Sequence, residues 1–324
     1  MAATIVPARW LRFLNDEYLA RFIREGGSSI KFAVPLDERL RPELGQGLLS
    51  TARAAGYLTA TVSSADTRVH MIDQLFNRIA EQIPWRELSA RVMLKLADEH
   101  GFVAPGPGPE PLVRRLADAN ALDAGMVTME GRRWVAKQVL HRPSLAKEFR
   151  TAMTTLCMAE LLGGSDGDSS VAANTDWLTG RNKATAAVKP YQIYNRITRS
   201  NARHLLDSLL LWIQYAGHPG IVVTVDLSRM AVARNPRDGQ LFYSKAQLLD
   251  AYEVLRQFID STDRMKGCLM VMLPAADFLD VEPFGRGMGA YSALKFRVYD
   301  EVHDQRLVNP MSSLVRISPL EHVA

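Results

Sequence analysis

The feature that most constrains this fold is a short apolar run, Gly220–Ser228, which carries a single acid, Asp226. The run reads Gly-Ile-Val-Val-Thr-Val-Asp-Leu-Ser and is rich in β-branched residues. Such a run behind a glycine is typical of a strand buried on both faces, as in a parallel sheet. Because α/β folds bind ligands beyond the carboxyl ends of their strands, Asp226 stands at a predicted ligand-binding position.

The rest of the chain supplies the other strands of such a sheet. A strand at 29–34, a loop at 35–42, a helix at 43–55 and a strand at 57–62 form a βαβ unit. Such a unit implies parallel strands joined by a right-handed crossover. A further buried strand is predicted at 268–273. The spacing of apolar residues predicts other helices at 8–25, 70–100 with a break at Pro84, 200–216, 244–260 and 290–298, and a short tail at 314–317. The sequence therefore predicts a three-layer α/β core.

Two segments in the middle of the chain, rich in glycine, proline or serine, are predicted to be loops. Residues 104–111 alternate proline with glycine and predict a stiff linker or surface loop. Residues 163–170 combine glycine, serine and aspartate and predict a flexible acidic loop. The stretch between them is mostly helical. We therefore predict an N-terminal part of the core at 1–103, a helical insertion at 104–175 and a C-terminal part of the core at 176–324.

Composition is that of an ordinary globular protein, with 47% apolar and 23% charged residues. The net charge of +4 is unevenly spread, because residues 131–203 hold twelve Lys and Arg against five Asp and Glu. That segment predicts a surface for nucleic acid or an acidic partner, and solvated helix faces are the alternative. The candidate contact residues are Arg132, Arg133, Arg181, Lys183, Arg196, Arg199 and Arg203.

The chain carries few signals for export, membrane insertion or metal binding. Its two cysteines lie far apart and make neither a disulfide framework nor a zinc site, which favours a reducing cytoplasm. Arg9 and Arg12 interrupt the apolar N-terminus, which argues against a signal peptide. The seven histidines are scattered without ligand spacing. Trp177 and Trp212 are expected to anchor the core rather than to stack on bases. We expect a cytoplasmic protein without a membrane segment or a metal.

The residues of the loop after the first predicted strand indicate whether the fold can bind a nucleotide. A phosphate cradle needs glycines that let backbone N–H groups approach, a lysine for the phosphates and a Ser or Thr for Mg²⁺. Residues 35–42 contain neither glycine nor lysine. Asp37 and Glu38 would repel phosphate, and Pro35 and Pro42 offer no N–H group. We therefore do not expect this loop to bind phosphate.

Several segments share their order and spacing with a known family. They are Gly-Gly-Ser-Ser-Ile-Lys-Phe at 26–32, Asp-Trp-Leu-Thr-Gly at 176–180, the helix, turn and strand at 203–226, and the helices at 252–260 and 289–297. Through them, nearly the whole chain resembles the BREX (bacteriophage exclusion) ATP-binding proteins, a P-loop group related to AAA-type ATPases. The resemblance implies a P-loop NTPase-like, AAA-type α/β/α core with a mainly parallel sheet and a helical insertion.

The motifs that carry the family's chemistry are degenerate here. On the family's register, Arg41 stands at the lysine position of the phosphate loop, and arginine is not equivalent to lysine there. Pro42 stands at the Ser/Thr position and has no hydroxyl for Mg²⁺. Asp226 matches the metal-binding acid, but Leu227 replaces the glutamate that usually poises the attacking water. Two independent losses predict a pseudo-ATPase in which Arg41 and Asp226 are vestigial nucleotide-binding residues. On this interpretation Asp226 caps a turn or pairs with an arginine.

The resemblance and the degenerate motifs together predict a non-catalytic subunit of a bacterial anti-phage complex. It would bind no cofactor and would scaffold a protein partner in a hetero-oligomer, with an active ATPase, helicase or nuclease, and DNA as a further candidate ligand. Arg297 and Arg316 are candidate arginine fingers for a neighbouring ATPase. The alternative is an active or nucleotide-sensing AAA-like ATPase with an unorthodox phosphate loop, which would use ATP with Mg²⁺ and act on DNA in the same context.

Overall fold

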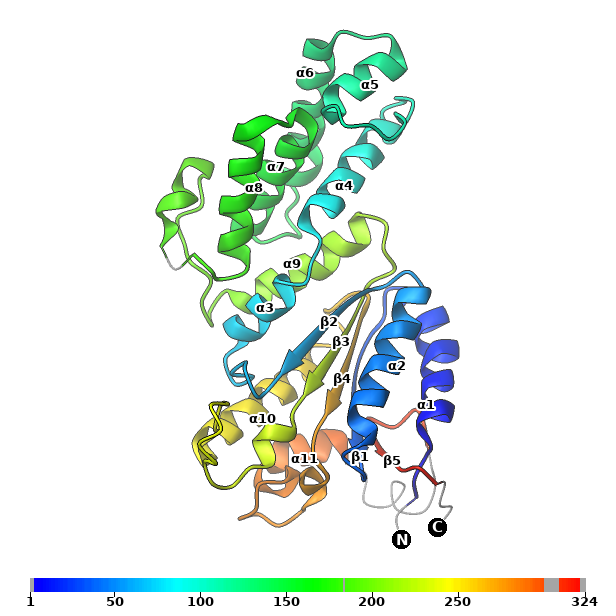
Figure 1. The fold of residues 1–324 in the computed structure, drawn as a ribbon, viewed down its shortest axis with the longest axis vertical. Coiled ribbons are helices and arrows are strands. Elements are labelled where there is room, and N and C mark those ends of the chain that lie inside the picture. Colours follow the sequence, from blue (N-terminus) through cyan, green and yellow to red (C-terminus); the bar gives the residue numbers. More distant parts are fainter. Residues whose placement is uncertain (1–2, 183, 300–308, 321–324) are drawn as a thin grey trace. The chain divides into compact units, whose positions relative to one another are not determined.

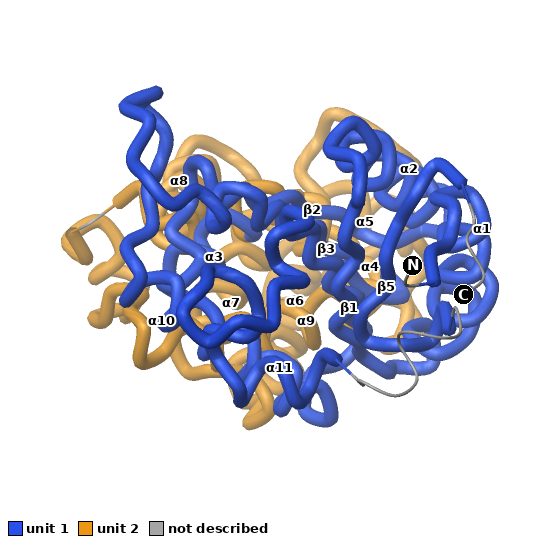
Figure 2. The backbone as a smooth tube through the Cα atoms, turned by 90° about the horizontal axis from the view of Figure 1, so that it is seen from below, with its two compact units in different colours: residues 1–79, 218–324 blue, residues 80–217 orange. Residues whose placement is uncertain are grey.

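The computed structural model describes residues 3–182, 184–299 and 309–320 (Figure 1). The chain divides into two compact units (Figure 2): residues 1–79 with 218–324 form unit 1, and residues 80–217 form unit 2. The predicted insertion at 104–175 lies within unit 2, which extends beyond it on both sides. The predicted domain bounds at 103/104 and 175/176 stay a prediction. None of the described helices is both long and apolar enough to cross a bilayer.

Unit 1 is built around a parallel sheet of five strands in its described residues, as the sequence predicts for an α/β fold. The strand order is β2-β3-β4-β1-β5, and every neighbouring pair is parallel. The strands are β1 (Ser28–Pro35), β2 (Leu58–Ser63), β3 (Ile221–Asp226), β4 (Cys268–Leu273) and β5 (Leu314–Ile317). β3 and β4 are buried almost throughout, because each lies inside the sheet with helices on both faces.

The fifth strand corrects the prediction that residues 314–317 form a tail. β5 is only four residues long, so no periodicity marks it in the sequence. It is fixed by long-range pairing with β1: the Phe32 N–H group donates to the Ser313 carbonyl at 2.7 Å, and the Leu36 N–H group donates to the Ile317 carbonyl at 2.8 Å. β5 therefore covers an edge of β1 that would otherwise be open.

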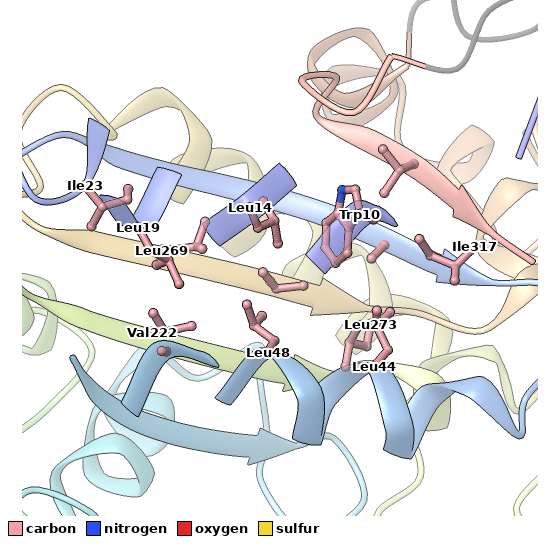
Figure 3. Packing of buried hydrophobic residues seen from close by; sticks show 14 of the residues in the cluster. Trp10, Leu14, Leu19, Ile23, Leu44, Leu48, Val222, Leu269, Leu273 and Ile317 are labelled. Atoms are coloured by element: carbon pink, nitrogen blue, oxygen red, sulfur yellow. The ribbon is translucent and has the colours of Figure 1, made fainter. Parts of the chain in front are cut away.

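One face of the sheet is covered by α1 (Pro7–Phe13), the π-helix Leu14–Phe22 and α2 (Leu40–Ala54). The predicted single helix at 8–25 is thus an α-helix that continues as a π-helix. Figure 3 shows these helices packing Trp10, Leu14, Leu19, Ile23, Leu44 and Leu48 against the sheet residues Val222, Leu269, Leu273 and Ile317. Because these side chains are nearly all inaccessible to solvent, their burial is the main force that holds α2 on the sheet.

The other face of the sheet carries α10 (Lys245–Asp260) and α11 (Ser292–Val298). The Phe32 ring of β1 stacks on Phe278 with centroids 5.3 Å apart, and Tyr252 of α10 meets Phe278 edge-on at 5.9 Å. Helix α10 starts at a capping box, in which Ser244 and Gln247 satisfy each other's backbone N–H groups. The helix α3 (Ile72–Ala80) follows β2.

Unit 2 is helical in all its regular elements. They are α4 (Trp85–Glu99), α5 (Leu112–Asn120), α6 (Ala124–Val135), the π-helix Ala136–Leu140, α7 (Lys147–Leu162), α8 (Gly164–Leu178), the 3₁₀ turns Thr185–Ala187 and Lys189–Tyr191, and α9 (Ala202–Tyr215). Trp177 and Trp212 are buried, which confirms their predicted role as core anchors.

The prediction of a flexible acidic loop at 163–170 is wrong, because residues 164–170 form the first half of α8 and Gly163 is its N-cap. Glycine and serine are poor helix formers, but packing overrides that weakness here. Trp177 and Val171 bury one side of α8. Arg86 of α4 bridges the helices, with its Nε atom 2.8 Å from Glu160 of α7 and its Nη2 atom bonded to Asp168 of α8.

Candidate functional site at the carboxyl edge of the sheet

The candidate site lies where β1, β3 and β4 end. From β1 the chain passes through residues 36–39 to α2 on one face, and from β4 it passes to α11, which packs beside α10 on the other face. Neighbouring strands whose connections leave on opposite faces form a topological switch point, the usual ligand crevice of an open α/β sheet. A ligand of this fold is therefore expected beside the loop after β1 and the ends of β3 and β4.

A buried arginine closes this edge. Arg41 lies in the first turn of α2, and its side chain is only 8% exposed. Its Nη1 atom donates to the carbonyl of Pro274 at 2.9 Å and also to that of Leu273, at the end of β4. Its Nε and Nη2 atoms bind the Glu38 carboxylate at 3.1 and 2.6 Å. The guanidinium thus joins the start of α2 to the end of β4, and its N–H groups donate to oxygens of the protein.

Asp226 meets this arginine at the end of β3. The Asp226 Oδ1 atom lies 3.7 Å from Nη1 of Arg41, and it accepts a hydrogen bond of 2.8 Å from the Ser228 N–H group. The structure therefore brings together the two residues that the sequence selects, which lie far apart in the chain. Asp226 makes both contacts expected of a non-catalytic residue, since it caps a turn and pairs with an arginine.

The loop after β1 directs most of its backbone donors inward. A phosphate cradle needs several N–H groups that converge on the ligand. Of the six N–H groups of residues 36–41, four donate to oxygens of the protein at 2.8–3.2 Å: those of Leu36, Arg39, Leu40 and Arg41. The loop is also only four residues long between β1 and α2. It is a tight turn into a helix rather than an open phosphate loop.

Two carboxylates face solvent beside the buried Arg41, as does the exposed Arg39 of the loop. The Glu38 side chain is 61% exposed and that of Asp226 is 35% exposed, whereas Arg41 lies beneath them. Glu38 is a residue that sequence reasoning missed as a partner of Arg41. Its signal is the i,i+3 spacing to Arg41 at the start of a helix, which places opposite charges side by side.

Lys31 does not replace the missing lysine of a phosphate loop. It lies in β1 and is 3% exposed. Its ammonium donates to the carbonyls of Met311 and, at 3.1 Å, Ser312, and it lies 4.7 Å from the centroid of the Tyr18 ring. Burial lowers the pKa of Lys31 to about 8. This lysine therefore ties the segment before β5 to β1.

A small, shallow hollow opens beside the ends of β3 and β4, on the α10 side. It is lined by Leu227, Met230, Ala231, Tyr252, Pro274, Ala275, Phe278 and Arg286. Its polar groups are engaged with the main chain: the Tyr252 hydroxyl donates to the Arg286 carbonyl at 2.6 Å, and the Arg286 guanidinium donates to Met230 and Tyr243 carbonyls at 2.8–3.0 Å. Over the described ranges, no group of three or more His, Cys, Asp or Glu is placed to hold a metal ion.

The two candidate arginine fingers lie elsewhere in unit 1. Arg297, near the end of α11, is 44% exposed and donates from Nε to Asp260 of α10 at 2.9 Å. Arg316 of β5 lies over the ring of Tyr299, 5.7 Å from its centroid. Their predicted role toward a neighbouring ATPase stays a prediction.

The candidate contact residues of unit 2 lie on α6, in the segment between α8 and α9, and at the start of α9. Arg132 and Arg133 are exposed in the last turn of α6, where Arg133 pairs with Glu130 at 3.0 Å. The others follow α8: Arg181 (3.7 Å from Asp176), the exposed Arg196 and Arg199, and Arg203 at the start of α9. Lys183 lies outside the described residues.

One comparison with known proteins finds a match. Residues 133–324, more than half of the chain, match the family described as BREX system ATP-binding protein BrxC/D. The matched range contains Asp226 and begins after the loop that carries Arg41. No curated protein and no solved structure matches the chain. The resemblance stated from the sequence is thereby confirmed over residues 133–324.

Proposed function

Because the chain belongs to the BREX system ATP-binding protein BrxC/D family, we propose that it is a non-catalytic subunit of an anti-phage complex. The family's system, bacteriophage exclusion, gives it a role in phage defence. The proposal adds that the sheet of unit 1 is a P-loop NTPase-like, AAA-type core that has lost its phosphate chemistry.

The observation that carries the proposal is the closure of the carboxyl edge by Arg41. The guanidinium that would have to meet the phosphates instead binds β4 carbonyls and Glu38. A triphosphate at this edge would also approach the carboxylates of Glu38 and Asp226. Two like charges about 4 Å apart repel by roughly 4 kcal/mol at an effective dielectric constant near 20. Only two N–H groups of residues 36–41, those of Asp37 and Glu38, make no hydrogen bond within the described residues, and Pro42 has no hydroxyl for Mg²⁺.

We assign the protein a scaffolding role toward other subunits of a defence complex, as part of a cytoplasmic hetero-oligomer with an active ATPase, helicase or nuclease. Among the described residues of unit 1, the aromatic side chains of Phe284 and Phe296 are 96% and 76% exposed. Aromatic residues are enriched at protein interfaces, so these side chains support a protein partner. Arg297 and Arg316 stay candidates for contact with a neighbouring ATPase. DNA is a further proposed ligand, through the basic residues of unit 2.

A second candidate function is an active or nucleotide-sensing ATPase that uses ATP with Mg²⁺. The observation in its favour is the Asp226 carboxylate, which stays 35% exposed at the end of β3, where a metal-binding acid would stand. This candidate requires Arg41 to leave its β4 contacts when a nucleotide binds.

Phosphate release from ATP separates the two candidates. The purified chain is assayed with Mg²⁺ beside Asp226→Asn, which removes the carboxylate charge at nearly constant volume. The scaffold proposal expects equal, background rates for both proteins. Turnover by the wild-type protein that Asp226→Asn abolishes would establish the second candidate instead.

A further inference from the structure

The segment that joins α8 to α9 has an unusual charge pattern. From Arg181 to Arg203 it carries six Lys and Arg and no Asp or Glu. Its regular structure consists of two 3₁₀ turns of three residues each, Thr185–Ala187 and Lys189–Tyr191. We call residues 189–199 the basic strap.

The main chain of the basic strap is held firmly to unit 2. Ile193 is fully buried, as is Val188 just before the strap. The indole N–H group of Trp177 donates to the Asn195 carbonyl at 3.0 Å. The Asn195 amide donates to Glu148 of α7 at 2.7 Å. At its far end, Asn201 donates to the Arg196 carbonyl at 3.1 Å. The strap therefore has a defined backbone although it is neither helix nor strand.

The strap exposes three cations and one aromatic ring to solvent. Tyr194 is 63% exposed, and Lys189, Arg196 and Arg199 are exposed as well. Within the described part of the chain, no ion pair engages these three cations. Two other cations of unit 2 are engaged: Arg133 pairs with Glu130, and Arg142 lies over the Tyr215 ring at 4.2 Å. The strap therefore presents uncompensated positive charge beside an exposed aromatic ring, on a backbone whose ordering needs no ligand.

We propose that the basic strap binds single-stranded nucleic acid, with Lys189, Arg196 and Arg199 at the phosphates and a base stacked on Tyr194. Non-specific binding of single strands combines these two elements, a cationic track for the backbone and aromatic rings for the bases. An intact duplex offers no free base face to Tyr194, and the short 3₁₀ turns are no helix for the major groove. The inference rests on the proposed contact with DNA and is independent of whether the carboxyl edge binds ATP.

The test measures fluorescence anisotropy of a labelled 20-nucleotide single strand, and of the corresponding duplex, with the full chain between 50 and 200 mM salt. The wild-type protein binds the single strand more tightly than the duplex. Tyr194→Ala weakens that binding roughly 5- to 150-fold, as expected for one lost base stack, and Tyr194→Phe, which keeps the ring, restores it. Arg196→Gln with Arg199→Gln lowers the salt slope by about 1.4, or about 0.7 for each phosphate contact.

Arg114→Gln with Lys137→Gln is the matched control, because it removes the same charge from exposed sites of unit 2 outside the strap. It is expected to change affinity less than the strap variant does. Equal losses in the two double variants would assign binding to net charge and overturn the proposal. Tighter binding of duplex, with Tyr194→Ala unchanged, would overturn it in favour of a duplex site. No binding at all would also overturn it. That result would not bear on the pseudo-ATPase proposal, which the nucleotide assays test separately.

Discussion

Replacing Arg41 by alanine is expected to destabilise unit 1 by about 3 kcal/mol. The substitution deprives the carbonyls of Leu273 and Pro274 of a charged donor. A hydrogen bond from a charged group contributes about 1.5–3 kcal/mol, and a buried acceptor left without a partner costs about 1–3 kcal/mol. The second cost falls on the Pro274 carbonyl alone, because the Leu273 carbonyl still accepts from the Leu227 N–H group at 3.0 Å. Water can reach part of this edge, since Asp226 is 35% exposed, so the two losses should not add fully. The expected total is therefore nearer 3 than 6 kcal/mol.

Urea unfolding followed by circular dichroism measures this loss. With a slope of about 2–3 kcal/mol per molar urea, 3 kcal/mol lowers the midpoint of the unit 1 transition by about 1–1.5 M. Glu38→Gln is the control, because it removes only the ion pair of a side chain that is 61% exposed. Such surface pairs are worth about 0–1 kcal/mol. A cost of Arg41→Ala no larger than that of Glu38→Gln would refute the view that the β4 contacts fix this arginine.

Two further perturbations test the packing of unit 1. Gly220→Ala should cost more than 3 kcal/mol, since Gly220 has φ +154° and an added Cβ would lie 1.9 Å from the Gly267 carbonyl oxygen. Gly26→Ala, also in unit 1, at φ +94° with nothing within 4 Å, should cost less in the same thermal unfolding scan. Burial lowers the pKa of Lys31 to about 8, below the value near 10.4 of an unfolded chain. The unfolded state therefore binds more protons between about pH 8 and 10, and stability should rise by roughly 2 kcal/mol over that range. In Lys31→Met this rise should be absent from urea titrations, and an unchanged pH dependence would contradict the assignment.

The strands that the sequence predicts well are those with purely local signals. Residues 268–273 are an unbroken apolar run between Gly267 and Pro274, and they coincide with β4. β5 and α8 were missed because their causes are not local. β5 forms through backbone pairing with β1. α8 forms because its buried residues and the bridge from Arg86 to Glu160 of α7 and Asp168 of α8 offset its weak helix propensity.

The sequence identifies the two residues that meet at the site, but it does not reveal the contacts that bury Arg41 there. Arg41 follows the first strand and Asp226 ends the third, and the carboxyl ends of parallel strands meet at one edge of a sheet. The contact of Arg41 with the Leu273 and Pro274 carbonyls depends on β4 lying between β3 and β1. That strand order is a property of the whole chain, so no short sequence window reveals it.

The most direct test of the central claim is calorimetric titration of the purified chain with ATP and with ADP, each with and without Mg²⁺. If Arg41 and the carboxylates of Glu38 and Asp226 close the carboxyl edge, no saturable heat should appear up to millimolar nucleotide. Saturable binding of ATP that Arg41→Ala or Asp226→Asn abolishes would contradict the account and would show that the loop after β1 holds phosphate.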